Sequence, residues 1–203
     1  MGKENYQLRL DATLQEITAS NRVPTLLLHA CCAPCASYVL EYLNHYFAIT
    51  LWYYNPNISP EEEYRFREAE LARLVKEMPA KHPISLLEAP YDPERFAKAA
   101  SGLESAPEGG ERCRACFALR LSAAAACAAE HGFDYVCTTL SISPLKNATL
   151  LNEIGAAAAK QHGVSWLYAD FKKREGYKRS CELSKQHGLY RQDYCGCVYS
   201  KKD

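Results

Sequence analysis

The sequence has no long apolar segment of the kind that forms a signal peptide or a membrane helix. Residues 1–10 carry charges and contain neither an apolar core nor a small-residue cleavage site. Residues 23–40 lack Asp, Glu, Lys and Arg, but they contain two prolines, one histidine and three cysteines, a composition that disfavours a membrane span. We therefore expect a cytoplasmic protein that has no membrane partner.

Several common functional motifs are also missing. The chain contains no Walker glycine loop, no GxSxG nucleophile elbow, no HExxH zinc motif and no GxGxxG dinucleotide fingerprint. The absence of the two glycine motifs argues against binding of a nucleoside triphosphate or a dinucleotide in the usual modes.

The formal net charge is zero, because 24 Lys and Arg balance 24 Asp and Glu. The charge is uneven along the chain, since residues 172–203 contain nine Lys or Arg against four Asp or Glu, a net of +5 that leaves −5 for the remainder. A basic end on a neutral chain suggests an anionic partner that is bound locally. A solvated tail without specific contacts is the alternative.

The chain is rich in cysteine, with ten in 203 residues. In a reducing cytoplasm, clustered cysteines are more often metal ligands or redox groups than structural disulfides. Seven of the ten form three clusters, which are Cys31, Cys32 and Cys35, then Cys113 and Cys116, and finally Cys195 and Cys197. Of the others, Cys127 and Cys137 fit packing positions in a helix and a strand, and Cys181 has no assigned role.

Apolar runs rich in β-branched and aromatic residues alternate with helix-length segments. The expected strands run from Pro24 into the first cysteine cluster and then over residues 47–54, 83–89, 133–139 and 164–168. Strands joined by helical crossovers predict an α/β protein with a parallel sheet and helices on both faces. We expect one domain over residues 1–203, with a helical extension at 1–22 and a basic segment at 171–203 that breaks the alternation.

The first cysteine cluster stands where the first strand turns into a helix. Ligands bind at the carboxyl ends of parallel strands, and the positive end of the following helix dipole favours thiolate over thiol. Cys31, Cys32 and Cys35 therefore suit a metal centre or a nucleophilic sulfur better than simple packing. His29, in the strand itself, is either a core histidine or a hydrogen-bond donor to a metal ligand.

The second cluster supplies two more thiols at the start of a helix, after a flexible loop over residues 101–110. Cys31, Cys32, Cys113 and Cys116 together could hold zinc in a closed tetrahedral site or an iron–sulfur cluster, which tolerates irregular spacing better. These residues alone leave both zinc and an iron–sulfur cluster as alternatives. Cys35 is a further ligand or the first thiol at the mouth of the site.

The third cluster is Cys195-Gly196-Cys197. A disulfide across one glycine closes a small strained ring that is easily reduced, which suits a redox couple better than a structural staple. Ligation of a metal by both sulfurs is the alternative.

Five motifs in one order resemble a known family. They are His29-Ala-Cys-Cys-Ala-Pro-Cys35, Tyr54-Asn-Pro-Asn-Ile58, Cys113-Arg-Ala-Cys116, Thr138-Thr-Leu-Ser-Ile-Ser-Pro144 with Lys146-Asn147, and Tyr194-Cys-Gly-Cys197. Together they resemble the QueH-type epoxyqueuosine reductases from about residue 26 to residue 200. Residues 1–24 and 101–110 carry no usable match.

The resemblance implies a HUP-type fold, like that of the adenine nucleotide alpha hydrolases, and a tRNA-modifying oxidoreductase. The implied reaction removes the epoxide oxygen of epoxyqueuosine at the tRNA wobble position and gives queuosine, the last step of its biosynthesis. It also implies a [4Fe-4S] cluster held by Cys31, Cys32, Cys113 and Cys116, a redox-active disulfide between Cys195 and Cys197, and one additional iron whose ligands no motif assigns. Cobalamin is not expected, and the electron donor is unidentified.

Two further roles stay open at this stage. The proton for the departing oxygen could come from His29, Tyr54 or a water molecule. Phosphates of the tRNA could meet the basic end, while Tyr177 or Tyr190 stacks on a base of the anticodon loop. The basic residues concerned are Lys172, Lys173, Arg174, Lys178 and Arg179.

Two other functions fit parts of the pattern. A tRNA sulfur-transfer enzyme of the same fold should need ATP and a glycine-rich loop after the first strand, where this chain has cysteines. A non-catalytic RNA adaptor would use the thiolates only to close a structural zinc site.

Overall fold

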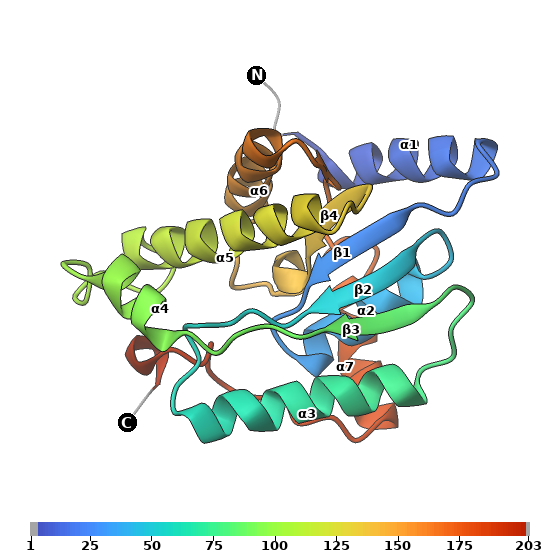
Figure 1. The fold of residues 1–203 in the computed structure, drawn as a ribbon. Coiled ribbons are helices and arrows are strands. Elements are labelled where there is room, and N and C mark those ends of the chain that lie inside the picture. Colours follow the sequence, from blue (N-terminus) through green and yellow to red (C-terminus); the bar gives the residue numbers. More distant parts are fainter. Residues whose placement is uncertain (1–3, 202–203) are drawn as a thin grey trace.

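The computed structural model describes residues 4–201, which form a five-stranded parallel sheet in the order β3-β2-β1-β4-β5 (Figure 1). All four strand pairs are parallel, as the alternation of strands and helices predicts. The strands are β1 (Thr25–His29), β2 (Ala48–Trp52), β3 (Ile84–Leu87), β4 (Tyr135–Thr138) and β5 (Ser165–Trp166).

Helices cover both faces of the sheet. Figure 1 shows α2, α3 and α7 on one face and α5 and α6 on the other. The helices are α1 (Tyr6–Ala19), α2 (Ala33–Leu43), α3 (Glu61–Glu77), α4 (Pro93–Ala100), α5 (Glu111–Glu130), α6 (Ala148–His162) and α7 (Gly176–Gln186), with short 3-10 turns η1 (Thr139–Ile142) and η2 (Val198–Ser200). Within residues 4–201, no helix combines the length and the apolarity needed to cross a bilayer.

The central strand β1 is buried on both sides because successive side chains point to opposite faces. Leu26 and Leu28 pack into the core with α2 and α3, whereas Leu27 packs into the core with α5 and α6. Three consecutive leucines thus serve two cores, which explains the continuous apolar run in this strand.

From β1 the chain adds β2 and β3 along one edge of this strand and later adds β4 and β5 along its other edge. Leu27 is in register with Thr50 of β2 and with Val136 of β4. The order of strands therefore reverses between β1 and β4, and the crevice outside their carboxyl ends is the usual ligand site of such a sheet. The turns that follow β1 and β4 line this crevice.

The structure refines one helix that the sequence predicts and departs from the sequence-based expectation in two others. Helix α2 begins at Ala33 with Cys32 as its N-cap, so Cys35 lies in its first turn. Helix α7 was not expected within the basic segment 171–203. Helix α1 buries Leu10, Leu14 and Ile17 in the main core, so residues 6–19 of the expected extension pack as part of the domain. Residues 1–3 and 202–203 of the expected single domain lie outside the described residues.

Candidate functional site

The first cysteine cluster converges at the turn between β1 and α2. The Sγ atoms of Cys31, Cys32 and Cys35 all lie within 4.8 Å of one another, and those of Cys31 and Cys32 are 3.8 Å apart. Cys32 is buried, while the other two are partly exposed toward a cavity of about 430 Å³. Three thiols this close together form a group that could hold a metal ion.

Within this cluster, Cys31 is the thiol whose surroundings most favour the thiolate form. Its Sγ lies 3.5 Å from Thr139 Oγ1 of η1, and its backbone N–H donates to the same hydroxyl at 3.2 Å. The thiols of Cys32 and Cys35 hold the pKa of Cys31 well below its ordinary value, and contact with Cys31 raises the pKa of Cys32 and Cys35. The arrangement thus favours one thiolate stabilised by its neighbours.

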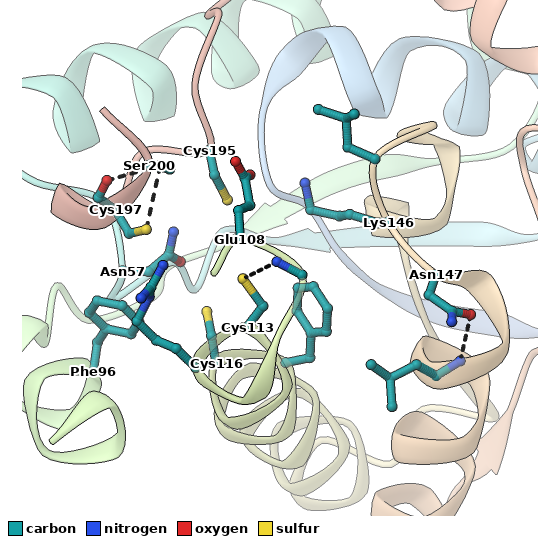
Figure 2. Close-up of a pocket in the computed structure, with 15 residues that line it drawn as sticks. Asn57, Phe96, Glu108, Cys113, Cys116, Lys146, Asn147, Cys195, Cys197 and Ser200 are labelled. Atoms are coloured by element: carbon teal, nitrogen blue, oxygen red, sulfur yellow. Dashed lines mark hydrogen bonds between the residues drawn. The ribbon is translucent and has the colours of Figure 1, made fainter. Parts of the chain in front are cut away.

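The second and third clusters face each other across a cavity of about 260 Å³ (Figure 2). Cys113 and Cys116 project from the first turns of α5, and Cys195 and Cys197 come from the loop after α7. Burial raises the pKa of Cys113, which accepts a hydrogen bond from the Gly109 backbone N–H at 3.2 Å. Burial also raises the pKa of Cys116, to about 11.

The structure therefore divides the four expected cluster ligands between two neighbouring cavities. Cys31 and Cys32 line the larger cavity together with Cys35, and Cys113 and Cys116 line the smaller one. The two cavities share Cys195 and Lys146 among their lining residues. Among the described residues, the compact group of three ligands contains Cys35 rather than Cys113 or Cys116.

The Cys195-Gly196-Cys197 loop is held in place by backbone contacts. Gly196 has φ +109°, and a Cβ atom there would lie 2.9 Å from Ile58 Cγ1, so glycine is required on both grounds. Its carbonyl accepts from the Ser59 N–H at 3.0 Å, and Arg67 donates to the Cys195 carbonyl at 3.3 Å. Both thiols are free in the structure, and Cys197 Sγ lies 3.4 Å from Ser200 Oγ.

A buried cation, Arg120, lies among the thiols. Its side chain is 1% exposed, its Nη1 lies 3.9 Å from Cys116 Sγ, and its Nε has no hydrogen-bond partner. No carboxylate pairs with it among the described residues. Burial disfavours its charge, but the thiols of Cys116, Cys195 and Cys31 raise the pKa of Arg120 above its ordinary value. The sequence analysis missed Arg120, although its position four residues after Cys116 places both on one face of α5.

Asn55, from the loop after β2, joins the two halves of the site. This fully buried side chain donates from Nδ2 to the Ala30 carbonyl at 2.9 Å and accepts from Arg120 Nη2 at Oδ1. Ala30 directly precedes Cys31, and Arg120 belongs to the helix that carries Cys116. One amide therefore positions both groups of cysteines.

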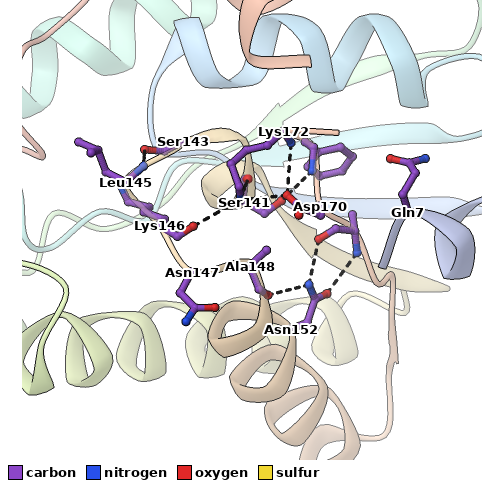
Figure 3. Close-up of polar contacts among 12 residues, drawn as sticks. Gln7, Ser141, Ser143, Leu145, Lys146, Asn147, Ala148, Asn152, Asp170 and Lys172 are labelled. Carbon is purple, nitrogen blue, oxygen red and sulfur yellow. Dashed lines mark hydrogen bonds and ion pairs between the residues drawn. The ribbon is translucent and has the colours of Figure 1, made fainter. Parts of the chain in front are cut away.

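Lys146 stands on the loop between η1 and α6. Its backbone carbonyl accepts a hydrogen bond from Lys172 Nζ at 3.3 Å, and Lys172 also donates to the Ser141 carbonyl at 2.8 Å (Figure 3). Asn147 caps α6 by accepting from the Leu150 N–H at 3.2 Å. Burial disfavours the charge of Lys146, but Cys195, Cys31 and Cys35 outweigh it and raise the pKa of Lys146 above its ordinary value.

Two of the candidate proton donors, His29 and Tyr54, lie outside the cavities that contain the cysteines. His29 is fully buried, its Nδ1 lies 2.8 Å from Thr138 Oγ1, and its Nε2 donates to the Tyr54 carbonyl at 3.0 Å. Burial lowers the pKa of His29 to about 3, so the ring is neutral and holds β1 to its neighbours. The Tyr54 ring stacks on Trp52 and borders a separate cavity. Neither side chain lines the cavities that contain the cysteines.

The remaining cysteines lie outside the site. Cys137 is buried in β4, and Cys127 is buried in α5 against the second core, as expected for packing residues. Cys181 is half-buried in α7 and lines neither cysteine cavity.

Most of the basic residues expected to meet an anionic partner form ion pairs within the chain. Arg174 pairs with Asp11 at 2.7 Å, and Arg179 pairs with Glu41 at 2.7 Å. The other two pairs join Lys172 to Asp170 at 2.9 Å and Lys178 to Glu175 at 3.4 Å. The two arginine pairs tie the segment after β5 to α1 and α2, a role that the local excess of positive charge did not indicate.

Comparisons with known proteins agree on one family. The profile of a family described as "Epoxyqueuosine reductase QueH" matches residues 26–203. A Streptococcus pyogenes serotype M1 protein of that name is 41% identical over 204 residues, which cover 98% of this chain and 80% of that protein. A Staphylococcus epidermidis protein of the same name is 42% identical, with 98% and 85% covered, and one from Thermotoga maritima is 32% identical, with 87% and 90% covered.

Removal of the Asn55 side chain should destabilise the fold. Asn55→Ala leaves the Ala30 carbonyl and one Arg120 N–H group buried without partners, at a cost of about 2–4 kcal/mol in the free energy of unfolding. Urea denaturation followed by circular dichroism measures it. Gln161→Ala, at an exposed position of α6, is the control and should change stability by less than about 0.5 kcal/mol. Equal stability of the two variants would contradict the joining role of Asn55.

Proposed function

The chain belongs to the epoxyqueuosine reductase QueH family, and from this membership we propose that it reduces epoxyqueuosine to queuosine at the wobble position of tRNA. The observation that carries the proposal is the convergence of all three cysteine clusters on neighbouring cavities at the carboxyl ends of β1 and β4. A redox reaction on a bulky nucleoside needs both an electron-transfer centre and an open cavity beside it, and this crevice has thiols suited to hold such a centre next to open cavities.

The residues around the thiols fit a bound [4Fe-4S] cluster. A cluster with four thiolate ligands is anionic, and Arg120 is a buried cation that has thiols rather than a carboxylate around it. A buried charge without compensation is strongly destabilising, so the orphaned Nε of Arg120 argues for an anionic group beside it. The donor set of soft thiolates suits iron and sulfide.

We assign Cys31, Cys32, Cys113 and Cys116 as the cluster ligands, and Cys195 and Cys197 as a redox-active pair. When bound, the cluster would supply electrons one at a time to the reacting centre. Cys195 and Cys197 can close to a disulfide with release of two electrons and two protons, and the rigid Gly196 keeps their thiols on the cavity wall. One additional iron belongs to this proposal without assigned ligands, and cobalamin does not.

The remaining residues position these groups. Asn55 and Arg120 hold the turn after β1 against α5, and Thr139 supports the Cys31 thiolate. Neutral His29 joins β1 to β4 and to the loop after β2 by hydrogen bonds, so the end of the strand that precedes the cysteine turn is held in place. The chain thus supplies a preorganised frame whose function is to hold the ligands and leave the cavity open to the substrate.

The partner is tRNA that carries epoxyqueuosine, in a cytoplasmic setting with an electron donor that is still unidentified. A contact between tRNA phosphates and the basic residues of segment 171–203 stays a prediction. The ion pairs of Arg174 and Arg179 weaken it, because these two side chains already have carboxylate partners. Tyr177 offers more support for a base contact, because it is 41% exposed, lines the larger cavity and lies beside Arg191.

A sulfur-transfer enzyme fits less well. The turn after β1 holds Cys31 and Cys32 where such an enzyme needs a glycine-rich phosphate loop. A zinc-binding adaptor would leave the open cavities beside the thiols without a role, since structural zinc sites are closed.

Metal analysis of protein purified without oxygen tests the cluster. We expect about four iron and four sulfide per chain, with broad visible absorption that dithionite bleaches. Cys113→Ala and Cys116→Ala should lose the iron, whereas Cys35→Ala and the packing control Cys127→Ala should retain it. Loss of iron in Cys35→Ala with retention in Cys113→Ala would contradict the proposed ligands and favour the compact group of Cys31, Cys32 and Cys35. Stoichiometric zinc without iron would favour the adaptor.

Arg120 should raise the reduction potential of the cluster. Reduction adds negative charge, so replacing this buried cation in Arg120→Gln should lower the midpoint potential of the cluster. Arg120→Lys keeps a positive charge and should leave the midpoint potential close to that of the unmodified protein. A redox titration followed in the visible spectrum measures the shift. Arg114→Gln, which removes an exposed arginine from the same helix, is the control. Equal potentials for Arg120→Gln and Arg114→Gln would refute the electrostatic role.

The activity itself is tested with tRNA that carries epoxyqueuosine and a low-potential reductant, under anaerobic conditions. Nucleoside mass spectrometry should show loss of one oxygen atom and formation of queuosine, without added ATP or cobalamin. Cys195→Ser and Cys197→Ser should each abolish repeated turnover if the pair cycles through a disulfide, and Cys181→Ser should not. ATP-dependent incorporation of sulfur would establish the transfer enzyme instead.

A further inference from the structure

We propose that Lys146 is a catalytic residue whose ammonium group binds the epoxide oxygen of the substrate and stabilises the charge that develops on it. The proposal rests on the proposed function and adds a substrate-contacting group that is not a thiol. It is carried by the position of Lys146, by the absence of a partner for its amino group among residues 4–201 and by the hydrogen bonds that hold its loop.

Lys146 lines both cysteine cavities. Figure 2 shows its side chain extending from the loop before α6 toward Cys195 and Glu108, with the amino group foremost. Because Cys195 and Lys146 line the same two cavities, a substrate that reaches Cys195 lies in a cavity that also contains this ammonium group. The lysine therefore lies beside the thiols that we assign to electron transfer.

The ammonium group has no partner within the described part of the chain. No carboxylate lies within 4.0 Å of Lys146 Nζ, and no hydrogen bond from this atom is found among residues 4–201, although Glu108 lines the same cavities. A partly buried cation without an acceptor is suited to bind one on a ligand. An epoxide oxygen is such an acceptor.

The other cations of the cavities are already engaged. Arg112 donates to the carbonyls of Leu103, Glu104 and Ala106, which holds the loop before α5. Arg120 faces Asn55 and Cys116, and Arg191 donates to Ser184 Oγ at 3.1 Å. Lys146 is thus the cation that is free to contact a substrate in both cavities, among those that the structure describes.

The loop that carries Lys146 is fixed on both sides. Its backbone N–H donates to the Ser143 carbonyl at 3.1 Å, and its carbonyl accepts from Lys172 (Figure 3). Asn147 follows directly as the N-cap of α6. Only the flexible side chain of Lys146 can therefore adjust, which places a donor in the cavity without moving the backbone.

The reaction balances without net consumption of the lysine. Removal of the epoxide oxygen breaks two C–O bonds, forms a C=C bond and releases water, at the cost of two electrons and two protons. An external low-potential reductant of the flavodoxin or dithiol class supplies the electrons, and solvent supplies the protons. Lys146 keeps its own proton and acts by hydrogen bonding and by its charge while the oxygen departs.

Steady-state kinetics on epoxyqueuosine tRNA is the first test. Lys146→Met should lower kcat by roughly 10²- to 10³-fold, as for loss of one donor to a developing negative charge, with a smaller change in KM. Lys146→Arg should restore a large part of kcat, and Lys146→Gln provides a second neutral variant. Lys160→Met, which removes an exposed charge from α6, should match the unmodified protein. Iron and sulfide per chain should be the same in all variants.

Equilibrium binding separates this role from a purely structural one. Anaerobically purified protein without reductant should bind an anticodon stem-loop with epoxyqueuosine about tenfold more tightly than the same stem-loop with queuosine, because only the epoxide offers the oxygen to a charged donor. Lys146→Met should lose this preference, and Lys160→Met should keep it.

Three results would overturn the proposal. Wild-type kcat and an unchanged epoxide preference in Lys146→Met would show that the lysine does not contact the oxygen, while leaving the proposed function intact. Loss of iron in Lys146→Met and Lys146→Gln would assign the residue to the metal centre. Failure of the unmodified, iron-loaded protein to convert epoxyqueuosine would refute the proposed function and the proposal together.

Discussion

The Asn55 amide is the contact on which the arrangement of the site depends. It joins the carbonyl of Ala30, directly before the first cysteine cluster, to Arg120 on the helix that carries the second. The same loop reaches the third cluster, since Ile58 packs against Gly196 and Ser59 bonds to its carbonyl. Because these groups are buried, water cannot take the place of a partner in these hydrogen bonds. The three cysteine clusters therefore keep one relative position.

Charge compensation is the second constraint. Thiolates in a crevice need nearby positive charge, and the fold supplies it through Arg120 beside Cys116 and Lys146 on the cavity wall (Figure 2). Arg120 contacts Cys116 and Asn55, whereas the amino group of Lys146 has no hydrogen-bond partner among residues 4–201. The first suits stabilisation of a bound anionic cluster, and the second suits contact with a substrate. A site with cations of both kinds can hold its ligands and still act on a molecule that enters.

The parallel sheet and the position of the cysteine turn were predictable from the sequence, because both depend on local patterns. Three consecutive leucines before Cys31 indicated a buried strand, and the strand–helix alternation indicated parallel pairing. Helix α7 was not predicted, since its eleven residues contain few apolar side chains and the segment was interpreted only through its positive charge. In the structure this helix packs on α2, where Arg179 pairs with Glu41.

The sequence by itself determined which cysteines could carry chemistry, since their spacing placed five of them at a strand end or a helix start and two in a Cys-Gly-Cys motif. The tertiary structure alone decided which charges remain available to a partner. Arg174 and Asp11 are 163 positions apart, and Asn55 and Arg120 are 65 apart, so no local pattern reveals that they pair. Nor does a local pattern reveal that Lys146 lacks a partner among residues 4–201, because a side chain's neighbours in the folded chain depend on every element that packs around it.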